Sequence, residues 1–122
     1  MNLWKIAVLS MVLGNTYAVA ECAKPDAPTL PNGATSAMED MLAGQKAVKA
    51  FQAANIEYMG CLEAAFNAAE KTAQSSKGDE KTAAQATYDE SIDAYNAAVS
   101  QEEEVAGQFN TEIRDYKAAN AK

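Results

Sequence analysis

Apolar residues recur at alternating intervals of four and three along two long, proline-free stretches of this chain. This spacing places them on one face of an α-helix and is typical of helices that pack along a heptad seam. The second stretch carries Tyr88, Ile92, Tyr95, Val99, Glu102, Ala106, Phe109, Ile113 and Tyr116. The first carries Met41, Gly44, Val48, Phe51, Asn55, Tyr58, Leu62 and Ala65, flanked by Leu42, Met59 and Phe66. The sequence therefore predicts an all-α fold built from two long helices.

Capping signals place the ends of these two helices. Ser36 with Glu39 three residues later matches a capping box, and Asp79 is a favourable N-cap residue. All 3 prolines precede the first of these signals, so no proline interrupts either stretch. The sequence predicts helices over about residues 36–75 and 79–118, which together form a helical unit of residues 36–122.

The break at residues 76–78 is short, so the two helices must be antiparallel neighbours in a coiled-coil-like hairpin. Folding the chain there pairs residues whose numbers sum to roughly 155, which brings Phe66 against Tyr88. Glu102 then lies level with Asn55, and a polar layer of this kind fixes the register of a coiled coil. The alternative is that Glu102 turns to solvent with the next two glutamates.

A proline-rich segment precedes the first helix. Cys22, Pro25, Pro28 and Pro31 recur at every third residue, and a polyproline II helix has three residues per turn, so the four share one face. The sequence from Pro31 to Gly33 is a turn signal that reverses the chain. We therefore predict an extended arm over residues 21–35 that runs back alongside the first helix.

The two cysteines, Cys22 and Cys61, have a single intramolecular pairing. The arm from Cys22 to Asn32 rises about 31 Å, and the helix from Ser36 to Cys61 spans about 37 Å, so the arm can deliver the first cysteine to the second. A lane of small side chains on the first helix is the expected bed for the arm: Ala43, Ala47, Ala50 and Ala54. An intermolecular disulfide and a flexible proline-rich tail are the alternatives.

Residues 1–20 have the pattern of a cleavable secretory signal: one lysine, an apolar run over residues 6–13, and an A-x-A site ending at Ala20. The apolar run is shorter than the roughly 20 residues that span a bilayer. Cys22 comes early enough to suggest a lipoprotein, but it follows Glu21 rather than a small residue. We expect a soluble exported protein with an oxidised disulfide; an uncleaved or lipidated anchor is the alternative.

Charge and composition exclude several classes of function. The 10 basic and 17 acidic residues give a net charge of −7, and removal of Lys5 with the signal makes it −8 (9 minus 17). Such a chain is repelled by nucleic acid and by anionic lipid, so we expect neither as a partner. The sequence has no histidine and lacks phosphate-loop, dinucleotide-binding and C-x-x-C motifs. We therefore expect no enzymatic activity, no cofactor and no metal site.

Carboxylates concentrate in the second predicted helix, where Lys81 is the one basic residue among residues 79–104. The eight acids are Asp79, Glu80, Asp89, Glu90, Asp93, Glu102, Glu103 and Glu104. Asp89 and Asp93 lie one turn apart, as two ligands of a divalent cation would, but calcium takes about six to eight oxygen ligands. A solvated acidic face that attracts a basic partner is the main expectation, and weak divalent-cation binding is the alternative function.

Two helices cover only one side of each other, and Ile56, Met59 and Val105 widen the apolar stripes beyond that contact. A leftover apolar flank marks a docking site for another helix or for a second copy of the hairpin. The acids beside it are Glu102, Glu103 and Glu104. The predicted function is that of a small adaptor, or a structural or chaperone-like accessory, which binds an unknown protein partner or itself.

Three segments carry a resemblance to a known group of proteins. They are C-x-x-P-x-x-P-x-x-P-x-G at Cys22 to Gly33, Y-x-x-C-L at Tyr58 to Leu62, and F-N-x-x-I-R-x-Y-K at Phe109 to Lys117. Together they resemble small, uncharacterised, alanine-rich helical proteins that Gram-negative bacteria export. The resemblance covers most of the chain after the signal and implies a periplasmic location, without implying an activity or binding residues.

Overall fold

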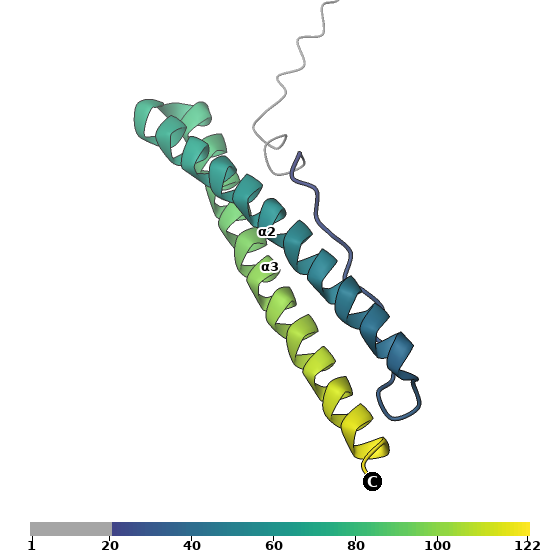
Figure 1. Ribbon diagram of the computed structural model, residues 1–122. Coiled ribbons are helices and arrows are strands. Elements are labelled where there is room, and N and C mark those ends of the chain that lie inside the picture. Colours follow the sequence, from purple (N-terminus) through teal and green to yellow (C-terminus); the bar gives the residue numbers. More distant parts are fainter. Residues whose placement is uncertain (1–20) are drawn as a thin grey trace, which may run out of the picture.

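The computed structural model describes residues 21–122, so the predicted signal sequence lies outside the described residues. The described part of the chain has two α-helices, α2 (Met38–Ser75) and α3 (Gly78–Ala119), and no strand. Figure 1 shows that they pack side by side and run in opposite directions, with an extended arm beside α2. The prediction of an all-α fold with two packed helices is confirmed.

The turn before α2 moves the start of this helix from the predicted Ser36 to Met38. Ser36 donates its backbone N–H to the carbonyl oxygen of Asn32 at 2.9 Å, so it belongs to the turn. Ala37 is the N-cap residue, and its N–H donates to the carboxylate of Asp40 at 3.3 Å. This contact replaces the predicted capping box, because the chain enters the helix one residue after the serine.

A two-residue connection joins the helices, and α3 begins at Gly78 rather than at the predicted Asp79. Lys77 is the N-cap residue. Gly78 has a φ of 64°, a left-handed conformation that glycine adopts without a steric penalty. Asp79 therefore lies in the first turn of α3, where its negative charge complements the helix dipole.

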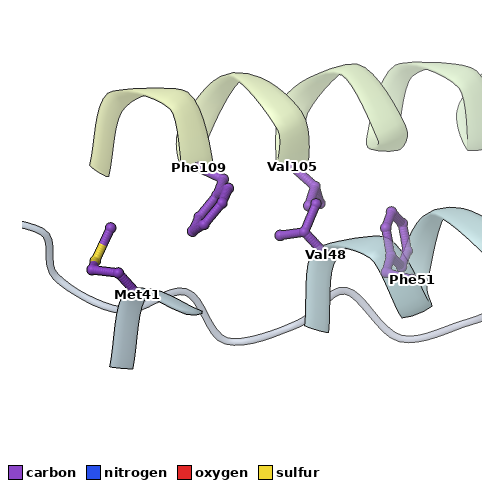
Figure 2. Packing of buried hydrophobic residues seen from close by; sticks show 5 residues of the cluster. All are labelled: Met41, Val48, Phe51, Val105 and Phe109. Atoms are coloured by element: carbon purple, nitrogen blue, oxygen red, sulfur yellow. The ribbon is translucent and has the colours of Figure 1, made fainter. Parts of the chain in front are cut away.

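The predicted seam of α2 is confirmed at every position. Its buried residues alternate by three and four: Met41, Gly44, Val48, Phe51, Asn55, Tyr58, Leu62, Ala65 and Ala69. Figure 2 shows three of them, Met41, Val48 and Phe51, facing Val105 and Phe109 of α3. Full burial of side chains of this size contributes about 1.5–3 kcal/mol each, so this contact is a main source of stability.

The seam of α3 is displaced from the predicted series. Its buried residues are Ala84, Thr87, Ser91, Ala98, Val105 and Phe109, so of the predicted positions only Phe109 is buried and the others are half-buried. Most of these buried side chains are small, so the two backbones can approach closely while the larger tyrosines and isoleucines lie to one side. The prediction of this seam is wrong because it placed the largest apolar side chains at the centre of the contact.

Asn55 provides the polar layer at the centre of the hairpin. Its side chain is fully buried, and its Nδ2 donates to the carbonyl oxygen of Ala98 at 3.0 Å. Glu102, the other predicted member of this layer, is only half-buried. Toward the connection, Phe66 meets Tyr88 edge to face with ring centroids 6.1 Å apart, as the predicted pairing requires.

The arm faces the helices with every third residue, as the polyproline II spacing predicts. Cys22 is buried, and the three prolines at positions 25, 28 and 31 are half-buried. The residues between them are exposed except Leu30, which packs against the core cluster of Figure 2. The structure joins Cys22 to Cys61 by a disulfide with a Cα–Cα distance of 5.6 Å, which confirms the predicted pairing.

The arm lies over the groove between the two helices and shares a hollow with two alanines of the predicted lane, Ala43 and Ala47. Pro31 lies against Gly44 of α2 and close to the ring of Phe109 of α3. Cys22 packs in a cluster with residues of both helices. Of the four alanines in the lane, only Ala47 is half-buried and the others are exposed. The groove is the more favourable packing site for the arm because both helices contribute apolar surface to it.

The turn at the start of α2 is fixed to the far end of α3. Ala34 donates its N–H to the Asn32 side chain at 3.0 Å, and Gly33 donates its N–H to the Glu112 carboxylate at 2.6 Å. Gly33 is buried so close to α3 that a Cβ there would overlap the backbone carbonyl of Glu112. The glycine is therefore required for the close approach of two backbones.

Candidate open face between the helices

The arm covers one side of the hairpin and leaves the other side uncovered. Ala47 of α2 shares a hollow with Leu30 and Pro31 of the arm, and Gln108 of α3 shares another. Ile56 and Val99 lie nine residues from Ala47 and Gln108, respectively. Nine residues make about two and a half helical turns, so these two side chains are on the side opposite the arm.

Apolar side chains lie on this uncovered side of both helices in groups spaced by three and four residues, with gaps of fourteen residues from Leu42 to Ile56 and from Val99 to Ile113. We call this surface the open face. On α2 it consists of Met38, Leu42, Ile56 and Met59, and on α3 of Tyr88, Ile92, Tyr95, Val99 and Ile113. The α3 members are those that the displaced seam moves out of the centre, and all are half-buried. The displacement of the α3 seam thus creates the apolar part of the open face.

Three side chains of α2 on the open face are strongly exposed. Met38, Leu42 and Ile56 have exposed fractions of 60%, 58% and 62%. Two of these three line a hollow near the start of α2. The hollow is lined by Met38, Met41, Leu42, Gln45, Phe109, Ile113 and Tyr116. A second, more polar hollow near the connection between the helices includes Tyr88 and Asp89.

The middle of the hairpin carries acids with no basic residue among them. Between Lys49 and Lys71 of α2, and between Lys81 and Arg114 of α3, every charged side chain is a carboxylate. The ten acids are Glu57, Glu63, Glu70, Asp89, Glu90, Asp93, Glu102, Glu103, Glu104 and Glu112. Glu102 and Glu112 are half-buried and the other eight are exposed. This imbalance creates a negative potential around the apolar stripe.

The structure separates the six residues that the sequence singled out for binding. Ile56 is exposed and Met59 is half-buried, and both lie on the open face. Val105 is 5% exposed and lies in the core, so it does not contribute to a surface flank. Glu102 continues the spacing of the half-buried α3 stripe, and the exposed Glu103 and Glu104 follow it.

Sequence reasoning missed one member of the open face, Met38, which is the first residue of α2 and precedes the predicted seam. The signal was present, since Met38 lies four residues before Leu42 and shares its helix face. The displaced members of α3 were found as apolar residues but assigned to the core. Their spacing was correct, and only their position relative to the helix contact was wrong.

The described residues carry no cluster of three or more acidic or cysteine side chains that would hold a metal ion. Asp89 and Asp93 are both exposed on α3, so water already solvates their carboxylates. Among residues 21–122 no helix has the length and hydropathy of a membrane span.

Searches of protein-family models, of curated proteins and of solved structures find no match to this chain.

Proposed function

We propose that this chain is a non-enzymatic periplasmic interaction protein, which binds another protein, or a second copy of itself, through the open face. The observation that carries this proposal is the exposed apolar surface of Met38, Leu42 and Ile56 on the side that the arm leaves uncovered. Met38 and Leu42 line one hollow and Ile56 lies fourteen residues further along α2, and exposed apolar patches rimmed by polar residues are typical of docking sites. The location rests on the predicted signal sequence and on an oxidising compartment for the disulfide.

The arm supports a binding role because it covers one side of the hairpin with residues of the same chain. It is held at one end by the disulfide and at the other by the turn against α3. Its residues bury apolar groups of both helices, much as a third helix would. A hairpin stabilised in this way on one side can present its other side to a partner without unfolding.

Position-specific photo-crosslinking in living cells tests the proposal. A photoreactive amino acid at Ile56 samples the open face, and the same group at Ala54 is a matched control on the same helix. Both positions are exposed, and two residues of helix place them about 160° apart. We expect crosslinked products from Ile56 and few from Ala54. Equal products from both positions, or none from Ile56, would contradict binding through the open face.

The identity of the crosslinked proteins distinguishes an adaptor, a chaperone-like accessory and a self-assembling protein. One stoichiometric envelope protein indicates an adaptor, and a broad range of unfolded exported proteins indicates a chaperone-like accessory. Recovery of the chain itself indicates self-assembly. Binding of a divalent cation is tested separately, because a melting temperature that does not respond to millimolar calcium or zinc excludes it.

A further inference from the structure

We infer that the ligand of the open face is a basic amphipathic helix, which lies along the groove between α2 and α3 as a third helix. This inference rests on the proposed function and adds the chemistry of the partner. The open face follows the shallow groove between the two antiparallel helices, which is hollowed near each end, and apolar side chains from both helices border it. Such a groove accepts one helix whose own apolar stripe repeats every three and four residues.

The acids around the groove indicate that the bound partner helix is positively charged. In α2, residues 50–70 contain Glu57, Glu63 and Glu70 and no basic residue. These 21 residues correspond to three heptads, about 32 Å of helix. In α3, Asp89 lines a hollow together with Tyr88 and Lys81, and the half-buried Glu102 continues the open-face series. A bound helix would therefore have carboxylates of both helices near it, Glu63 and Glu70 from α2 and Asp89 and Glu102 from α3.

A second copy of this chain does not match this surface. Its net charge is −7, and its own open face has the same unbalanced acids, so two copies would bring carboxylates against carboxylates. A helix with lysine or arginine on both sides of an apolar stripe instead places a cation near each acid. The charges also raise the rate of association, because the acidic surface attracts a cationic partner over about a Debye length.

Synthetic helical peptides provide the probe. The test peptide has three heptads with leucine at positions a and d and lysine at positions e and g. One matched peptide has glutamate in place of each lysine, and another keeps the lysines but has a scrambled apolar pattern. Fluorescence anisotropy with the oxidised protein measures each affinity at physiological and at roughly 0.5 M salt, where the Debye length is shorter.

We expect the lysine peptide to bind at least about tenfold more tightly than either matched peptide, and more weakly at the higher salt concentration. The variant Ile56→Asp/Val99→Asp should weaken binding by about tenfold or more, whereas Ala54→Asp leaves it unchanged. The variant Glu63→Gln/Asp89→Asn/Glu102→Gln should weaken it by about three- to tenfold, since each exposed ion pair contributes roughly 0.2–1 kcal/mol. These substitutions lie outside the core, and circular dichroism confirms that each variant is folded.

Three results would overturn the inference: equal affinity for the lysine and glutamate peptides, equal affinity for the scrambled peptide, or binding that Ile56→Asp/Val99→Asp does not change. The outcome is separable from that of the proposed function. If Ile56 crosslinks a protein in cells but the lysine peptide does not bind, the open face is a binding site and the basic helix is not its ligand. If neither occurs, both proposals are wrong.

Discussion

The two grooves between α2 and α3 are built by the same pair of helices and differ in what covers them. One groove is filled by the arm, whose cysteine and prolines face inward and whose ends are fixed by a disulfide and a turn. The other groove is bordered by half-buried and exposed apolar side chains with acids beside them. Two helices alone leave apolar surface on both sides, and this chain covers only one side itself.

The arm side and the open face therefore have different roles in the protein. Contacts on the arm side close a long loop and bury apolar groups, so they contribute mainly to stability. The strongly exposed side chains of the open face, Met38, Leu42 and Ile56, are mostly in solvent in the free protein, so changing them should affect binding more than folding. Substitutions on the two sides therefore separate these contributions.

The largest effect is expected from removal of the disulfide on the arm side. The two cysteines are separated by 39 residues, and in the chain-entropy model a closed loop of this size contributes about 4 kcal/mol. The variant Cys22→Ser/Cys61→Ser should therefore lose about 4 kcal/mol in the free energy of unfolding, as measured by urea denaturation. An unchanged midpoint would show that the arm does not hold the fold.

A smaller effect is expected where the turn meets α3. In Gly33→Ala the new Cβ overlaps the carbonyl of Glu112, so a backbone has to move, at a cost of about 1–3 kcal/mol. The matched control is Gly60→Ala, since a Cβ at this helical glycine meets no atom within 4 Å. The control should gain about 0.5–1 kcal/mol from helix propensity. Urea denaturation that gives the same sign for both variants contradicts the close approach of the turn.

The smallest effect on stability is expected on the open face. Ile56 is 62% exposed, so Ile56→Ser should change the free energy of unfolding by less than about 0.5 kcal/mol. Thermal denaturation at low protein concentration measures this change. A loss of several kcal/mol would mean that Ile56 is already covered in the free protein, and the contrast between the two sides would then disappear.

Much of the fold was predictable because its signals are local. The α2 seam follows from spacing alone, since Leu62 and its neighbours at three and four residues are all buried. The arm follows from the three-residue repeat of its prolines, and the disulfide from the presence of only two cysteines. The α3 seam was not predictable in this way, because the choice between Ser91 and Ile92 depends on how closely the backbones approach.

The candidate site was predictable only in part, for the same reason. Ile56 and the acids of α3 were found, because exposure on a flank follows from helix spacing and charge. Val105 was assigned to the surface although it is buried, because the α3 seam lies one residue away from the predicted one. The contact of the arm with α3 was missed, since a groove between two helices exists only after they have packed.

Methyl-detected NMR of the free protein with a soluble paramagnetic agent tests most directly whether one side is open. The three isoleucines of residues 21–122, namely Ile56, Ile92 and Ile113, all lie on the open face, and the fully buried Leu62 is the internal reference. We predict that the agent attenuates all three isoleucine methyl signals, that of Ile56 most strongly, and leaves Leu62 unaffected. Isoleucine signals as protected as that of Leu62 would show that the face is covered and would contradict the account.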